Sequence, residues 1–250
     1  GEIMELADGI SEIADLPDSF SARLRISGKC LLDLVLNFAY IFEVSEAETI
    51  AMGYTPENKD DFIETVQIEA PTQSAPIVCI MDSGVQEEHK YLAPSISSDE
   101  SISLLPNNTS TSDEVAGGGH GTRVAGAVLY PKAVPLDGVY QLPCWIRNMR
   151  ILDENNCLPE SVYPPKAIAI AVQKYNVENQ IPTKIFNHSI GSHRPCEMKH
   201  MTPWAAEIDS QSYNHDVLFI QAAGNISTDV ISAYWQAGYP YPEYLDRELC

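Results

Sequence analysis

From residue 77 onward the hydrophobic residues fall into short continuous runs separated by longer mixed stretches. Residues 77–81 form an uninterrupted apolar run, Ile-Val-Cys-Ile-Met, of the length of one strand. Such a run is typical of a parallel strand that is buried on both faces. Three later stretches also read as strands: residues 145–152, 184–190 and 217–223. The pattern therefore predicts at least four strands of one parallel sheet.

The stretches between these runs have the character of helices. Residues 121–129 combine small and apolar side chains, and residues 165–175 begin with Pro165, which is favoured in the first turn of a helix. Residues 202–213 form the third expected helix, and residues 95–114 are expected to be a long polar loop. Alternating strands and helices predict an α/β fold with a doubly wound parallel sheet.

The first 70 residues differ from the rest of the chain. We expect a helix over residues 28–40, a short strand over 40–44 and a second strand over 62–68, which together form a small α+β segment. Residues 71–76, Pro-Thr-Gln-Ser-Ala-Pro, have the composition of a linker. The predicted organisation is an N-terminal segment (1–70), a linker (71–76) and a main domain (77–250).

Two polar residues lie at the ends of predicted strands. Asp82 follows the run at 77–81, and Asn225 follows the last strand after Ala222, Ala223 and Gly224. In doubly wound sheets functional groups gather at the carboxyl ends of the strands. Each residue taken alone also fits a simpler interpretation, since Asp often forms turns or caps helices and Asn tolerates a left-handed turn.

A histidine stands among glycines at the start of the first expected helix. His120 follows three glycines and precedes Gly121 and Thr122. Glycines let the backbone approach another segment closely and leave the imidazole accessible. A carboxylate that accepts from one ring nitrogen fixes the tautomer, so that the other nitrogen can take a proton. Asp82 could play this part for His120, although a glycine-rich helix start with an incidental histidine is the open alternative.

Composition narrows the possible partners. The chain of 250 residues carries 35 acidic and 15 basic residues, which gives a formal net charge of −20. A nucleic-acid partner would need clustered Lys and Arg, so we expect none. The longest apolar run, residues 31–44, is too short and too polar to span a bilayer, and no membrane association is expected.

The cysteines and histidines match no metal site. None of the six cysteines forms a CxxC pair, and their spacing fits no zinc template, so we expect neither a metal nor a cofactor. Cys79 lies in an apolar run and is expected to be a buried free thiol. The irregular spacing favours a reducing, cytoplasmic location, while a secreted protein stays open as the alternative.

Four segments of the chain resemble, in order, the signature segments of the subtilisin-like serine proteases, or subtilases. They read IVCIMDSGV, GGHGTRVAGAV, NHSIGS and VLFIQAAGN. The resemblance covers roughly residues 75–240 and implies the doubly wound sheet of the subtilisin type, here incomplete. It implies that residues 77–250 are the N-terminal part of the catalytic domain.

The resemblance also implies roles for individual residues. Asp82 matches the aspartate of the catalytic triad, His120 the general base and Asn225 the donor to the oxyanion. Two further segments match the binding site of an extended polypeptide substrate: Ser189, Ile190 and Gly191 as the edge that pairs with substrate backbone, and Ala222, Ala223 and Gly224 as a wall of the specificity pocket. Residues 1–70 match the position of a prodomain, and an unrelated regulatory segment is an equal alternative.

The sequence has no match to the family's nucleophilic serine. This serine lies in a G-T-S-x-A/S segment, and the 250 residues contain none. We therefore expect a serine endopeptidase whose serine, together with the C-terminal part of the catalytic domain, lies outside this sequence, so that the chain alone is inactive. The alternative is a subtilase-like module without catalysis that binds peptides or regulates another protein.

Overall fold

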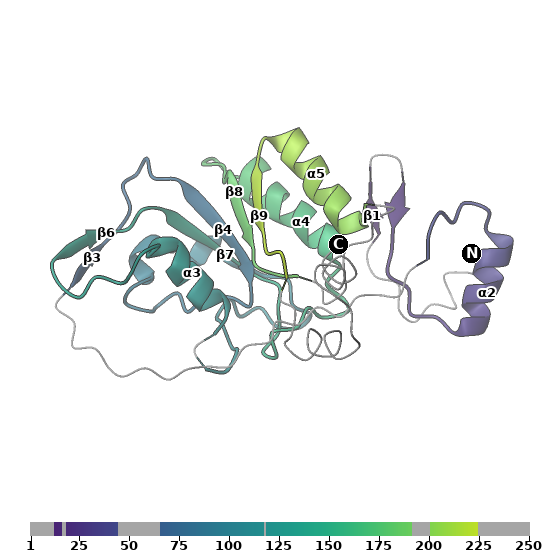
Figure 1. Cartoon of the computed structure of the whole chain (residues 1–250), viewed down its shortest axis with the longest axis horizontal. Helices are drawn as coiled ribbons and strands as arrows, with labels where there is room; N and C mark the ends of the chain where they lie inside the picture. Colours follow the sequence, from purple (N-terminus) through teal and green to yellow (C-terminus); the bar gives the residue numbers. More distant parts are fainter. Residues whose placement is uncertain (1–12, 17–18, 45–65, 118, 192–200, 225–250) are drawn as a thin grey trace, which may run out of the picture.

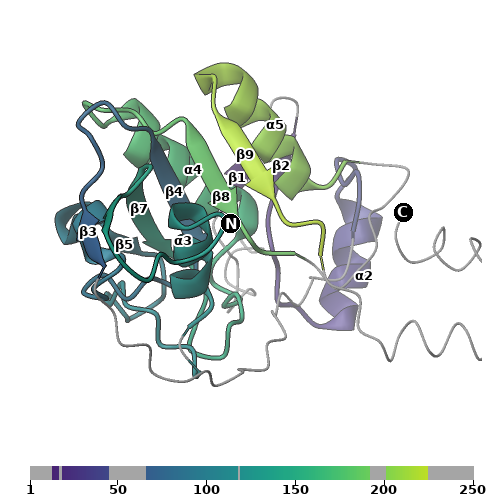
Figure 2. The ribbon, with the colours of Figure 1, turned by 60° about the vertical axis from the view of Figure 1, so that its left-hand side comes forward.

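The computed structural model describes residues 13–16, 19–44, 66–117, 119–191 and 201–224 of the chain. Its central feature is a five-stranded sheet in the order β5-β7-β4-β8-β9, in which every pairing is parallel (Figure 2). The strands are β4 (Ile77–Asp82), β5 (Ile102–Ser103), β7 (Trp145–Arg150), β8 (Ile185–His188) and β9 (Leu218–Gln221). The four strands expected from the apolar runs are therefore confirmed.

Strand β4 lies in the middle of the sheet and is buried on both faces. Val78 and Ile80 pack on one face with residues of helix α3 (Gly121–Leu129). Cys79 and Met81 pack on the other face with residues of α4 (Pro164–Val172). This double burial explains why the sequence of β4 is an unbroken apolar run.

Helices cover both faces of the sheet, as a doubly wound fold requires. Helix α3 lies on one face, and α4 lies on the other beside α5 (Pro203–His215) (Figure 1). Helix α4 continues into a π-helical turn, η3 (Gln173–Val177). The three predicted helices are confirmed, α3 with the expected ends and α4 and α5 with ends shifted by one to three residues.

The order of the strands reverses at β4. After β4 the chain forms β5 at one edge of the sheet, passes through α3 and returns as β7 beside β4, and it then crosses through α4 to β8 on the other side of β4. In open α/β sheets ligands bind outside the carboxyl ends of the strands at such a switch point. Asp82, the last residue of β4, therefore lies where a ligand is expected to bind.

The stretch at 95–114 is more ordered than its polar sequence predicts. It holds a 3-10 turn η2 (Ser98–Glu100) and the edge strand β5, which follow the turn η1 (Ala93–Ser95). Side chains from η3 and β7 hold η2 in place, because the Tyr175 hydroxyl donates to the Glu100 carbonyl at 2.8 Å and Arg147 contacts the Glu100 carboxylate at 3.1 Å. Long-range contacts of this kind leave no local pattern in the sequence.

A second small sheet pairs β3 (Gln67–Glu69) with β6 (Val139–Gln141) in parallel. β3 overlaps the end of the strand expected at 62–68, of which residues 62–65 lie outside the described part. β6 was not predicted from the sequence. This pairing joins a strand before the expected linker at 71–76 to a strand after it. The domain boundaries stay a prediction.

The N-terminal segment contains a hairpin of β1 (Ala14–Asp15) and β2 (Phe20–Ser21) and the helix α2 (Gly28–Asn37). Figures 1 and 2 show α2 standing apart from the sheet, and none of its residues is buried. The strand expected at 40–44 is wrong. Tyr40 and Phe42 are 84% and 82% exposed, and no strand pairs with this stretch in the described part of the chain.

None of the helices in the described ranges is long and apolar enough to cross a membrane.

Candidate active site

The site begins with Asp82, which is the last residue of β4 and is completely buried. β7 pairs with β4 so that Arg150 lies opposite Asp82 in the register. The backbone N–H of Ser83 donates to Asp82 Oδ1 at 2.7 Å. A strand end at the switch point thus holds a carboxylate in a place shielded from water.

His120 reaches this carboxylate from a separate element. It occupies the N-cap position of α3, and its Nδ1 lies 2.6 Å from Asp82 Oδ1, although the two residues are 38 positions apart. Because an ionised carboxylate can only accept, Nδ1 carries the proton and Nε2 is the basic nitrogen. The side chain of His120 keeps 16% exposure, against none for that of Asp82. The structure thus joins the two residues singled out in the sequence.

Gly121 allows these two segments to approach so closely, and Gly84 allows the loop at 111–112 to pack against the Asp82 segment. A Cβ on Gly121 would lie 2.3 Å from the Gly84 carbonyl oxygen and 3.0 Å from Asp82 Cβ. A Cβ on Gly84, which has a φ of +97°, would lie 2.5 Å from the Thr111 carbonyl oxygen. The Thr122 hydroxyl also accepts from the Gln86 backbone N–H at 3.0 Å. The Asp-Ser-Gly and His-Gly-Thr segments therefore pack directly against each other, and this contact is the joint between β4 and α3.

The electrostatics of the pair favour a charged imidazole. The hydrogen bond with Asp82 raises the pKa of His120 above its ordinary value, against the opposing effect of partial burial. Burial raises the pKa of the Asp82 carboxyl, and the hydrogen bond with His120 counteracts that rise. An aspartate in this position stabilises an imidazolium that forms when the histidine takes up a proton.

The two predicted substrate segments lie side by side. One follows β8 and contains Ser189, Ile190 and Gly191, and the other follows β9 and contains Ala222, Ala223 and Gly224. A Cβ on Gly191 would lie 3.2 Å from Gly224 Cα, and the Ala222 N–H donates to the His188 carbonyl at 3.1 Å. The side chain of Ile190 is fully buried, so only its backbone could meet a substrate.

Asn225, the predicted oxyanion donor, lies outside the described residues. The description ends one residue earlier, at Gly224 with a φ of +95°. The role of Asn225 therefore stays a prediction.

A buried histidine that was not singled out in the sequence lies where the two substrate segments begin. His188 ends β8, and its Nδ1 lies 2.7 Å from Gln221 Oε1 at the end of β9. Its ring packs edge-on against Trp204 at 5.1 Å between ring centroids. Burial lowers the pKa of His188 to about 4, so this ring is neutral at physiological pH. Its position at the end of a predicted strand was the one available signal.

Asp113 and Arg150 were also missed. Both are buried beside the pair, and a charged residue within the run at 145–152 was a signal that the sequence carried. Among the described residues, no group of three or more His, Cys, Asp and Glu side chains could hold a metal ion. Cys79 is buried and unpaired, as predicted, and burial raises the pKa of its thiol.

Fold and site together define a doubly wound α/β protein with a carboxylate–histidine pair at its switch point. The model of the subtilase family, Peptidase_S8, matches residues 73–243, which is well over half of the chain. The chain belongs to this family of serine proteases.

Similar solved structures are also proteases. The serine protease of Aeromonas sobria, in a complex with the chaperone ORF2, is 16% identical with a TM-score of 0.42, and the match covers 60% of this chain and 25% of that one. A lanthipeptide protease is 22% identical with a TM-score of 0.43, and the match covers 60% of this chain and 39% of that one. The chain thus spans well under half of these proteins. No curated protein matches it.

Proposed function

We propose that this chain carries the Asp–His part of a serine endopeptidase of the subtilisin type. The hydrogen bond of 2.6 Å between His120 Nδ1 and Asp82 Oδ1 supports this most strongly, because it leaves Nε2 as the base within a subtilase sequence. His120 takes the proton of a serine hydroxyl, Asp82 orients the ring and stabilises the imidazolium, and Asn225 donates to the oxyanion.

The substrate is a polypeptide in an extended conformation. The backbone at Ser189, Ile190 and Gly191 forms the edge along which the substrate adds as a further strand. Ala222, Ala223 and Gly224 form the neighbouring wall of the pocket for one substrate side chain. The closeness of Gly191 to Gly224 supports a single binding site built by both segments.

The nucleophile comes from sequence outside these 250 residues, which hold no G-T-S-x-A/S segment. The chain by itself is therefore inactive, and it functions together with the remaining C-terminal part of the catalytic domain. The second candidate function is a subtilase-like module that binds peptides without cleaving them. The missing segment is the observation that favours this alternative.

Labelling with a fluorophosphonate, which reacts with activated serines, separates these functions. The full-length protein should label, His120→Ala should abolish the labelling, and the 250-residue chain should not label. Ala at position 120 removes the base but leaves the serine in place, so it reports on activation. Absence of labelling in the full-length protein would reject the endopeptidase and favour the binding module.

A further inference from the structure

A second carboxylate, Asp113, lies beside the Asp–His pair and has only 4% of its surface exposed. Its Oδ1 accepts from the Ser83 hydroxyl at 3.0 Å and from the Val115 backbone N–H at 3.2 Å. Its Oδ2 accepts from the Thr122 backbone N–H at 2.8 Å. Asp113 therefore caps the first turn of α3, the helix that carries His120 at its N-cap.

The Ser83 side chain links Asp113 to the residue that follows His120. Its hydroxyl donates to Asp113 and accepts from the Gly121 backbone N–H at 2.9 Å. Ser83 directly follows Asp82, and Gly121 directly follows His120. One carboxylate and one hydroxyl thus connect the end of β4 with the start of α3.

The glycine before His120 makes room for the carboxylate. A Cβ on Gly119 would lie 1.9 Å from Asp113 Oδ2, and Gly119 has a φ of +76°, which favours glycine. The backbone on the N-terminal side of His120 therefore rests directly against Asp113. Glycine is therefore needed at position 119 because any side chain there would displace the Asp113 carboxylate.

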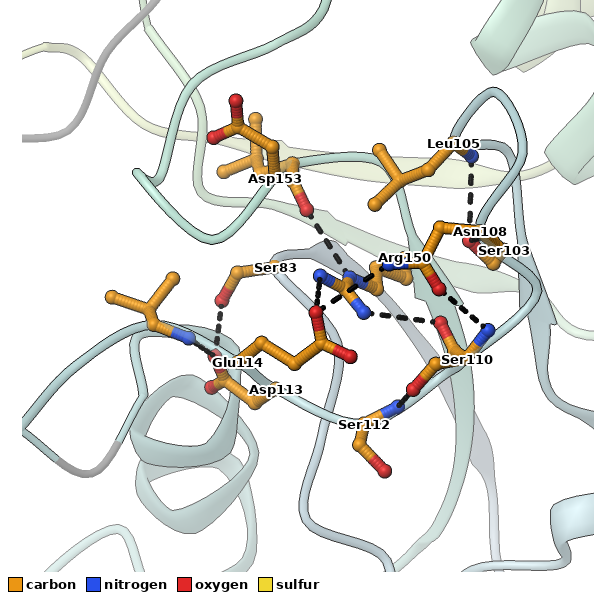
Figure 3. A network of polar contacts seen from close by, with 12 residues as sticks. Ser83, Ser103, Leu105, Asn108, Ser110, Ser112, Asp113, Glu114, Arg150 and Asp153 are labelled. Carbon is orange, nitrogen blue, oxygen red and sulfur yellow. Dashed lines mark hydrogen bonds and ion pairs between the residues drawn. The ribbon is translucent and has the colours of Figure 1, made fainter.

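A buried arginine holds the loop that carries Asp113 (Figure 3). Arg150, opposite Asp82 in the sheet register, is completely buried and contacts Glu114 Oε2 at 2.9 Å. It also donates to the Ser110 carbonyl at 3.2 Å. Residues on both sides of the stretch 111–113 are thereby fixed to β7, next to the strand that carries Asp82.

We propose that Asp113 is a positioning residue for His120, which it holds against Asp82 through Ser83 and the first turn of α3. The inference rests on the proposed function, since positioning matters for catalysis only if His120 is the base. Asp113 contacts Ser83, which follows Asp82, and Thr122, which lies two residues after His120. A buried carboxylate that only stabilised its own loop would not need to contact residues adjacent to both Asp82 and His120.

The negative charge of Asp113, like that of Asp82, raises the pKa of His120. Asp82 and then Asp113 raise the pKa of His120, while partial burial and the guanidinium of Arg123 lower it. Removal of the negative charge at position 113 should therefore lower the pKa of His120. This expectation gives the proposal a readout that a general loss of stability would not produce.

The test is an NMR titration of the 250-residue chain with 15N-labelled histidine, in which His120→Gln identifies the His120 signal. In the unsubstituted chain we expect Nδ1 to carry the proton when the ring is neutral. Asp113→Asn should shift the titration midpoint of His120 downward and reduce the fraction of this tautomer, because an amide nitrogen would then face the Thr122 N–H.

Asp153→Asn is the matched control. Asp153 also accepts from two backbone N–H groups, those of Asn155 and Cys157, both at 2.9 Å, but it contacts neither Ser83 nor α3. It should leave the midpoint and tautomer of His120 unchanged. The signal of buried His188 should stay the same in both variants. An unchanged His120 in Asp113→Asn, or an equal change in Asp153→Asn, would overturn the proposal.

Ser83→Ala keeps the proposal testable if Asp113→Asn does not fold. It retains the charge of Asp113 and removes the hydroxyl that donates to Asp113 and accepts from the Gly121 N–H. We expect a clear loss of the Nδ1–H tautomer with a smaller shift of the midpoint than charge removal would cause. A folded Ser83→Ala chain with unchanged His120 signals would contradict the positioning role.

Kinetics of the full-length protein separate this inference from the proposed function. If the protein cleaves peptides, Asp113→Asn should lower kcat by about 10- to 100-fold, since small misplacements of catalytic groups have effects of that order, with little change in KM. An unchanged kcat would overturn the inference and leave the protease intact. A full-length protein that neither labels nor cleaves would reject the proposed function, while the titration still decides whether Asp113 positions His120.

Discussion

The Asp82 carboxylate is buried at a strand end, where an isolated charge would be costly. His120 Nδ1 and the Ser83 N–H both donate to Oδ1, and these two hydrogen bonds offset part of that cost. Oδ2 has no hydrogen-bond partner within the described part of the protein. At the scale of single residues, the site combines a buried acceptor with a partly exposed base.

The second buried histidine supports a prediction about acid stability. Burial lowers the pKa of His188 from 6.5 to about 4, so the folded state holds this ring neutral. Its contribution to stability is present above pH 6.5 and is lost as the pH falls from 6.5 through about 4, because the unfolded chain binds the proton more readily. The loss should reach about 3 kcal/mol of unfolding free energy.

Urea unfolding of the 250-residue chain at a series of pH values measures this effect. His188→Gln should remove that part of the pH dependence between pH 6.5 and 4, even if it lowers stability at neutral pH. The exposed His89 is the control, and His89→Gln should leave the dependence intact. The same acid loss in His188→Gln as in the unsubstituted chain would refute the assignment.

At the scale of elements, the joint between β4 and α3 depends on the absence of a side chain at position 121. Gly121→Ala places a Cβ 2.3 Å from the Gly84 carbonyl oxygen, so the two segments must separate. We expect a loss of about 3 kcal/mol in unfolding free energy, as for overpacking of a tight core. Denaturant unfolding of the chain gives this value.

Gly126→Ala is the matched control on the same helix, because a Cβ at position 126 meets nothing within 4 Å. Alanine is the better helix former there, and stability should rise by about 0.5–1 kcal/mol. Similar losses in both variants would show that the loss at position 121 does not come from the contact with the Gly84 carbonyl.

The sequence was sufficient for the parts of the fold that local patterns encode. Unbroken apolar runs predicted β4 and β9, and small residues after His120 predicted α3 with its observed bounds. Elements held by distant partners escaped prediction. β5 consists of two residues paired with the edge of β7, and β6 depends on β3, about 70 positions earlier. The expected strand at 40–44 failed because apolar residues alone supply no partner strand.

The site shows the same division. Asp82 and His120 stand in recognisable sequence segments, so they could be named before their contact was known. Asp113 lies in a polar loop where acidic residues are common, and only the three-dimensional structure brings it to Ser83 and Thr122. Sequence patterns report which face an element buries, but they do not report which loop meets that element from outside.

At the scale of the whole molecule, the two cores on either side of the sheet predict how the thiols react. Cys79 and Cys144 are buried in opposite cores, and burial raises their pKa, that of Cys144 to about 11. Cys30 and Cys157 are partly exposed. Iodoacetamide followed by mass spectrometry should modify Cys30 and Cys157 in the native chain and reach Cys79 and Cys144 only on global unfolding. Early modification of Cys79 would contradict a packed sheet.

The central claim is that Asp82 and His120 activate a serine that lies outside these 250 residues. Mass spectrometry of the fluorophosphonate adduct on the full-length protein tests it most directly, because it identifies the modified residue. The account predicts one adduct, on the serine of a G-T-S-x-A/S segment beyond the 250 residues, and its loss in His120→Ala. An adduct on a serine within them, such as Ser83 or Ser189, or one that persists in His120→Ala, would contradict it.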